Sequence, residues 1–127
     1  MNGSRGNVLV VDDNDTVRLT LVRVLQSRGY QATGFGTGEE AIREVEERSF
    51  DVALCDIHLP GINGIQAALE IRRLIPSCRV LLMSGNSGSS EYLEAALRAG
   101  HTFEVLNKPF DPPMLFAVLA GQPVPAS

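Results

Sequence analysis

Hydrophobic and polar positions along this chain follow two alternating patterns. Short apolar runs of strand length are each followed by a longer segment in which apolar residues recur every three or four positions. The short runs fall at residues 7–12, 31–35, 51–55, 80–83 and 103–106. This alternation predicts an α/β fold, a doubly wound five-stranded parallel sheet with helices on both faces.

The strands differ in polarity, which indicates their places in the sheet. Residues 51–55 are mostly apolar, as expected for a strand covered on both faces. The run 31–35 contains Gln31, Thr33 and Gly34, so we place it at an edge.

Helix boundaries are marked by capping residues, by glycine and by proline. Asn14, Asp15 or Thr16 is expected to cap the first helix, which closes at Gly29. A capping box of Thr37 and Glu40 is predicted to begin the second helix, and the third is predicted from about Gly64 to Ile75. Serines near residue 90 are expected to cap the fourth helix, which ends at Gly100. The last helix (114–120) is predicted to be short and apolar, with Pro112 and Pro113 in its first turn.

Polar side chains follow four of the apolar runs. Asp12 and Asp13 end the first run, Asp56 the third and Ser84 the fourth, and Lys108 follows the fifth. The carboxyl ends of parallel strands meet at one rim of the sheet, where open α/β folds bind ligands. We therefore predict one site built from all five residues.

Three carboxylates at one rim repel one another unless a cation lies among them. Mg²⁺ prefers oxygen ligands and few protein carboxylates, so the sequence predicts an Mg²⁺ site at Asp12, Asp13 and Asp56, where Mn²⁺ could substitute. The simpler alternative is that residues 12–15 only place negative charge at a helix N-terminus, but that leaves Asp56 and Lys108 unexplained.

Asp56 is the candidate nucleophile, since a carboxylate can accept a phosphoryl group. Ser84 could donate a hydrogen bond to one phosphoryl oxygen and Lys108 could pair with another. Taken singly, Ser84 is better explained as part of a capped loop and Lys108 as a solvated lysine; the functional interpretation depends on their occurring together with Asp56. The Lys108–Pro109 peptide bond is a candidate for the cis form.

Composition narrows the classes of function. The 127 residues suffice for one domain, predicted at 7–120 between a tail at 1–6 and a tail or linker at 121–127. A net charge of -4 argues against nucleic-acid or membrane binding, and no apolar run is long enough to span a bilayer. Cys55 and Cys78 fit reduced core thiols of a cytoplasmic protein, and neither His58 nor His101 has a partner at metal-ligand spacing.

Four segments together resemble the receiver domain of two-component response regulators (the CheY-like family). These are Val8-Leu-Val-Val-Asp-Asp13, Asp56-Ile-His-Leu-Pro-Gly-Ile-Asn-Gly64, Leu82-Met-Ser-Gly85 and Asn107-Lys-Pro-Phe110. The resemblance covers residues 7 to about 120 and implies a flavodoxin-like sheet ordered 2-1-3-4-5.

The resemblance also implies a role for each site residue. Asp56 would accept a phosphoryl group from a histidine kinase or a histidine phosphotransfer protein, and Ser84 and Lys108 would contact that group. The ligands of Mg²⁺ would be Asp13, Asp12 largely through water, an Asp56 oxygen and the backbone carbonyl of His58. The side chains of His58 and Asn86 match positions that tune dephosphorylation.

As a member of this family, the protein would be a signalling switch rather than a turnover enzyme. Phosphorylation would change the surface formed by the fourth helix, fifth strand and fifth helix, which would bind a downstream protein, an attached domain or a second copy. The sequence does not distinguish a free-standing regulator from one domain of a longer chain.

Two features depart from the family pattern. Val105 stands where an aromatic residue usually reports the state of the hydroxyl, and Phe103 lies two residues away on the same strand face. The last helix is unusually apolar: its side chains are either core or a contact surface.

Two other functions are compatible with parts of the pattern. A phosphatase of the haloacid dehalogenase type would use Asp13 as nucleophile and Asp15 as general acid, but it leaves Asp56 without a role. A receiver-like binding module that accepts no phosphoryl group is the other alternative.

Overall fold

The computed structural model describes residues 5–85 and 91–125 and shows the predicted alternation of strands and helices. The elements in order are β1 (Asn7–Val11), α1 (Asp15–Ser27), β2 (Gln31–Phe35), α2 (Gly38–Glu47), β3 (Val52–Asp56), α3 (Gly64–Leu74), β4 (Arg79–Ser84), α4 (Glu91–Arg98), β5 (Glu104–Asn107) and α5 (Pro112–Leu119).

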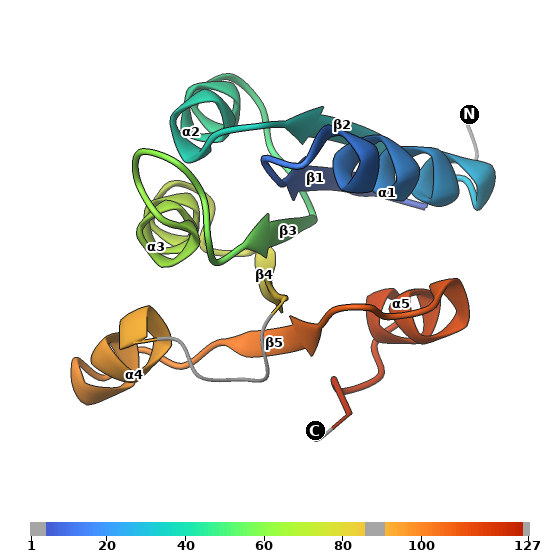
Figure 1. Cartoon of the computed structure of the whole chain (residues 1–127). Helices are drawn as coiled ribbons and strands as arrows, with labels where there is room; N and C mark the ends of the chain where they lie inside the picture. The colour runs from blue at the N-terminus through green and yellow to red at the C-terminus, as the bar shows by residue number, and fades with distance from the viewer. Residues whose placement is uncertain (1–4, 86–90, 126–127) are drawn as a thin grey trace.

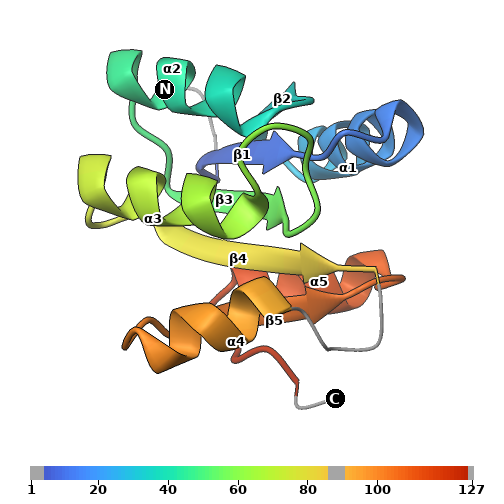
Figure 2. The same cartoon turned by 60° about the vertical axis from the view of Figure 1, so that its left-hand side comes forward.

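The strands form one parallel sheet in the order β2-β1-β3-β4-β5, which confirms the predicted fold class, its topology and the edge position of β2 (Figure 1). Val11 pairs with Cys55, Asp56 with Met83 and Ser84 with Asn107. The carboxyl ends of the inner strands therefore lie along one edge, where the arrowheads gather in Figure 2.

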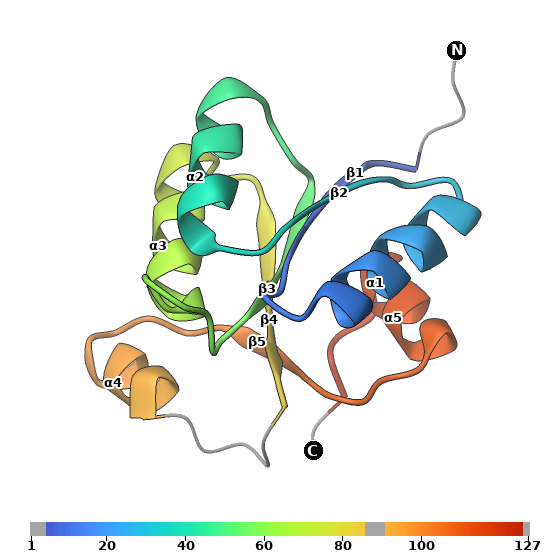
Figure 3. The same cartoon turned by 45° about the horizontal axis from the view of Figure 1, so that its top comes forward.

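Each face of the sheet packs against its own helices. Alternate residues of β1 divide between the two faces: Leu9 and Val11 contact the side of α2, α3 and α4, and Val8 and Val10 contact the side of α1 and α5. Figure 3 shows α1 and α5 next to each other on this second side. Both cores are apolar, in contrast to the polar side chains at the carboxyl ends of the strands.

The helix caps are partly those predicted. Asn14 caps α1, and Gly29 follows that helix with a φ of 90°. The Thr37–Glu40 box is only half formed, since Thr37 Oγ1 accepts from the Glu40 amide while its own hydroxyl donates to the Glu40 carboxylate. The complete capping box, which the sequence analysis did not find, is Asn63 with Gln66.

Four strands differ slightly from their predicted bounds, among them β3, which begins at Val52 rather than Asp51 and includes Asp56. β1 ends at Val11 rather than Asp12, β4 spans Arg79–Ser84, and β5 begins at Glu104 rather than Phe103. Asp12 nevertheless extends the ladder, because its amide donates to the Phe35 carbonyl at 3.1 Å. The predicted serine caps of α4 lie at 86–90, outside the described residues.

The apolar side chains of α5 belong mainly to the core. Leu115 and Val118 are buried, and Met114, Phe116 and Leu119 pack against the same cluster as partly buried residues. In the part of the chain that the structure describes, no helix has the length and apolar character needed to cross a membrane.

Candidate phosphoacceptor site

Three carboxylates meet at the carboxyl edge of the sheet. Asp12 follows β1 and is fully buried, Asp13 is exposed, and Asp56 ends β3 with 8% of its surface exposed. One carboxylate oxygen of each lies within 4.8 Å of the others. The structure thus brings together the three acidic residues that were predicted as metal ligands.

Lys108 follows the edge strand β5, and its side chain extends to this cluster. Its Nζ lies 2.7 Å from Asp12 Oδ2 and 3.2 Å from Asp56 Oδ2. Its backbone amide donates to the Ser84 carbonyl at 2.8 Å, so the end of β4 holds the segment that carries the lysine. The following bond to Pro109 is cis, as predicted.

The charges at the site are not balanced. Burial raises the pKa of Asp56 above its ordinary value, although the charge of Lys108 and the His58 amide act in the opposite direction. Burial also lowers the pKa of Lys108, but its hydrogen bond to Asp12 and the charge of Asp56 outweigh this, so that pKa is raised overall. Lys108 therefore stays a cation, and ionised Asp56 remains only partly compensated.

The backbone around Asp56 is shaped by one close approach. A Cβ at Gly64 would lie 1.9 Å from the Asp56 carbonyl oxygen, so only glycine fits there. The amide of Gly64 donates to the Ile57 carbonyl at 2.8 Å, and the His58 amide donates to Asp56 Oδ1 at 3.1 Å. The loop after β3 is thereby folded back onto the carboxylate, with the His58 side chain exposed.

The cluster opens to solvent through a depression of about 370 Å³. Its lining residues are Asp12, Asp13, Asn14, Val17, Asp56, His58, Gly85 and Lys108. Hard oxygen donors, more negative than positive charge and room for water are what Mg²⁺ requires. The donor set therefore fits Mg²⁺, with Asp12, Asp13 and Asp56 as its carboxylate ligands.

Comparison with known proteins agrees with this geometry. Residues 8–120 match the family model described as response regulator receiver domain. The chain belongs to that family.

Individual relatives show both short and long members. The chain is 33% identical over 106 residues to the chemotaxis protein CheY of Thermotoga maritima, covering 83% of this chain and 87% of CheY. It is 36% identical over 109 residues to the DNA-binding transcriptional regulator NtrC of Escherichia coli K12, covering 84% of this chain but 22% of NtrC. The chain thus spans about a quarter or less of such regulators.

Among solved structures, the fold is similar to that of a response regulator from Burkholderia pseudomallei described with a phosphorylated aspartic acid, a calcium ion and citrate. The two chains share 28% identity with a TM-score of 0.76, over 89% of this chain and 65% of the other. Receiver domains are modules of two-component signalling and not classical enzymes, and their acidic pocket binds Mg²⁺.

The remaining residues that were considered for the site lie at different places relative to the depression. Ser84 ends β4 with 4% of its surface exposed, beside the cluster but not lining the depression. His101 is exposed after α4 and is not among the lining residues. Asn86 lies outside the described residues.

Phe103, the aromatic residue noted near Val105, lies just before β5 and contacts an arginine. Phe103 packs against the same cluster as Val105, but the guanidinium of Arg72 lies 4.0 Å from the centre of its ring.

Two residues near the site were not predicted from the sequence to be part of it. Asn14 lines the depression, and its amide donates to Asp12 Oδ1 at 2.9 Å. Arg18 donates from Nη1 to the Asp12 carbonyl at 2.8 Å. The signal for Asn14 was its place next to the acidic pair, whereas nothing in the local pattern distinguishes Arg18 from Arg23, the other arginine of α1.

Proposed function

We propose that this receiver domain is a phosphorylation-dependent switch in which Asp56 accepts a phosphoryl group from a histidine kinase or a histidine phosphotransfer protein. The observation that supports this most is the position of Asp56. Asp56 Oδ2 lies 3.2 Å from Lys108 Nζ, and Asp56 also lines an open depression together with the carboxylates of Asp12 and Asp13. A nucleophile, a fixed cation and a site for Mg²⁺ are thus next to one another.

The transfer forms one bond and breaks one. An Asp56 carboxylate oxygen attacks phosphorus, the phosphorus–nitrogen bond of the phosphohistidine breaks, and its electron pair stays on the imidazole nitrogen. Lys108 and the Ser84 hydroxyl neutralise and orient the phosphoryl oxygens. Mg²⁺, held by Asp12, Asp13, Asp56 and the His58 carbonyl, would supply further charge neutralisation. The product is an acyl phosphate on Asp56.

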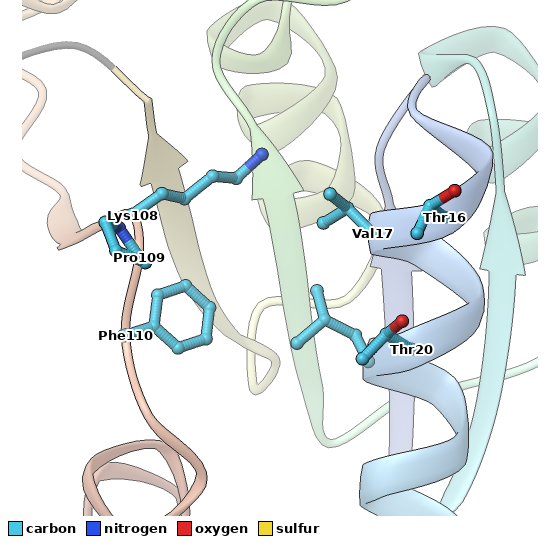
Figure 4. Close-up of a pocket in the computed structure, with 7 residues that line it drawn as sticks. Thr16, Val17, Thr20, Lys108, Pro109 and Phe110 are labelled. Atoms are coloured by element: carbon cyan, nitrogen blue, oxygen red, sulfur yellow. The ribbon is translucent and has the colours of Figure 1, made fainter.

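The phosphodonor must cover this edge of the sheet to present its imidazole. Next to Lys108 lies an apolar hollow of about 340 Å³ between α1 and the segment after β5. In Figure 4, Thr16, Val17 and Thr20 line it from the helix and Phe110 faces them. A donor helix or loop packed there would be adjacent to Asp56.

The output surface is proposed on α4, β5 and α5. Tyr92 and Leu97 of α4 are 49% and 53% exposed, and they are two of the three large apolar side chains exposed among the described residues, the third being Leu19 of α1. The Tyr92 ring lies 6.2 Å from that of His58, two residues after Asp56. Phosphorylation would thereby change a surface that could bind a downstream protein, an attached domain or a second copy. We expect the protein to act in the cytoplasm, where Cys55 and Cys78 would stay reduced.

The test is an intact mass after incubation with acetyl phosphate and Mg²⁺. We expect the mass of one phosphoryl group to be added, and to be lost in Asp56→Asn and when Mg²⁺ is chelated. Asp51→Asn is the matched control, since Asp51 precedes the same strand at its opposite end.

Other results would favour the alternatives. A gain that survives in Asp56→Asn and disappears in Asp13→Asn would indicate the dehalogenase-type chemistry. No gain from either acetyl phosphate or a phosphorylated phosphotransfer protein, with Mg²⁺ still bound, would indicate a receiver-like binding module.

A further inference from the structure

Arg18 of α1 connects the edge strand β2 with the loop that carries the acidic pair. Its Nη1 donates to the Asp12 carbonyl at 2.8 Å, and its Nη2 lies 2.6 Å from Asp15 Oδ1. The side chain is 19% exposed, so most of its surface is covered. One guanidinium therefore binds both sides of the loop at residues 12–15.

Two glycines of the β2 region make room for this side chain. A Cβ at Gly34 would lie 2.8 Å from Arg18 Cγ, 3.1 Å from Arg18 Cδ and 3.2 Å from Val22 Cγ2, so its closest contacts would be with the Arg18 stem. A Cβ at Gly36 would lie 3.3 Å from Arg18 Nη1. Neither glycine has a positive φ. The backbone does not require glycine at Gly34, but the stem of Arg18 does.

The other polar groups of Asp12 are already fixed. Its amide donates to the Phe35 carbonyl, Oδ1 accepts from the Asn14 amide, and Oδ2 accepts from Lys108 Nζ. Arg18 adds the bond to the carbonyl. Because this carbonyl shares a rigid peptide plane with the Asp13 amide, the same bond fixes the direction in which the chain enters Asp13.

We propose that Arg18 is a positioning residue for the metal site, holding the Asp12–Asp13 peptide so that the exposed Asp13 carboxylate stays directed at Asp56, and that Gly34 is the position that admits it. The inference rests on the proposed function, because it assumes that the three carboxylates bind Mg²⁺. Groups that orient metal ligands without touching the metal commonly have large effects on affinity.

Charge and geometry make opposite predictions for this residue. A cation near the cluster repels Mg²⁺, so loss of charge alone would tighten binding. Loss of positioning would weaken binding. Arg18→Lys keeps the positive charge, but a lysine lacks the planar guanidinium that donates to the Asp12 carbonyl and to Asp15 at the same time. It therefore isolates the geometric role.

The experiment is a Mn²⁺ titration followed by the electron paramagnetic resonance signal of the free ion, with Mg²⁺ as competitor. We expect Arg18→Lys to weaken binding of both ions by about tenfold. Gly34→Ala should weaken binding similarly in the native background but have a clearly smaller effect in an Arg18→Ala background, where only the longer contact with Val22 remains. Arg23→Ala, an exposed arginine of the same helix, is the control for charge and should not weaken binding.

A second readout needs no metal. Amide hydrogen exchange at Asp13 and Asn14, measured by NMR on metal-free protein, should be faster in Arg18→Lys and Gly34→Ala than in the native chain. Native affinity in folded Arg18→Lys, or equal effects of Gly34→Ala in both backgrounds, would overturn the inference. If the native chain itself binds neither Mn²⁺ nor Mg²⁺, the metal site of the proposed function fails instead.

Discussion

The two ends of the β4–β5 strand pair carry ionic groups of opposite design. At the amino end, Arg79 and Glu104 form a two-bond pair, with 2.8 Å from Nε to Oε2 and 2.7 Å from Nη2 to Oε1. At the carboxyl end, Lys108 bonds single oxygens of Asp12 and Asp56. The first arrangement matches one cation with one carboxylate, and the second has carboxylates in excess.

The pKa values follow this difference. The hydrogen bonds from Arg79 lower the pKa of Glu104, so its ionised form is stabilised. Burial raises the pKa of Asp56, so its ionised form is destabilised despite Lys108. Arg79 also donates to the carbonyls of Val118 and Gln122, which ties α5 and the segment after it to the sheet. The amino end ties the structure together, and the carboxyl end is where we propose that Mg²⁺ and a phosphoryl group bind.

The largest expected contrast is in phosphorylation rate. Lys108→Met removes the cation that neutralises the phosphoryl oxygens, so the rate of modification by acetyl phosphate should fall about a hundredfold. Arg79→Met removes an equal charge from the other end and should leave that rate nearly unchanged. Equal losses in the two variants, measured by intact mass against time, would show that the two ends do not differ in function.

Removing one carboxylate should change stability in opposite directions at the two ends. Asp56→Asn relieves a buried, partly compensated charge and should raise the free energy of unfolding by about 1 kcal/mol. Glu104→Gln weakens a half-exposed pair and should lower it by about 0.5 kcal/mol. Urea unfolding at pH 7 without Mg²⁺ measures both, and a loss of stability in Asp56→Asn would contradict the proposed charge excess.

These stability differences should also depend on pH, and neither should be larger in acid than at pH 7. The folded pKa of Asp56 lies above 3.8, so the native state binds more protons than the unfolded state in the window above that value, and its stability falls as pH rises through it. The advantage of Asp56→Asn should therefore be absent below pH 3.8 and grow above it.

Glu104 should behave in the reverse way. Its folded pKa lies below 4.5, so its contribution is present above pH 4.5 and is lost as pH falls through the folded pKa. The deficit of Glu104→Gln should fade in acid. Urea midpoints of both variants and the native chain between pH 3 and 7 test the two signs together.

The sequence predicted which side chains meet at this edge of the sheet, because these residues follow strands. Asp12, Asp56 and Ser84 each come at or next to the end of an apolar run, and parallel strands bring such ends to one edge whatever their separation in sequence. The strand order came from the resemblance to a family, since periodicity alone does not determine which strands are neighbours.

Side-chain contacts away from the carboxyl ends of the strands could not be predicted. Arg79 and Glu104 meet because the register places Leu81 opposite Glu104 and leaves Arg79 within reach, which no local pattern shows. Arg18 is identified only once Gly34 lies against it. By contrast, the Asn63–Gln66 capping box was a local signature that sequence analysis could have found.

The most direct test of the central claim locates the phosphoryl group. Borohydride reduces an acyl phosphate to an alcohol, so treatment of the acetyl-phosphate product should convert the modified aspartate to homoserine. Peptide mapping by tandem mass spectrometry then identifies the position. We predict homoserine at Asp56, only after incubation with Mg²⁺. Homoserine at Asp12 or Asp13, or none at Asp56 in protein that has gained a phosphoryl group, would contradict this account.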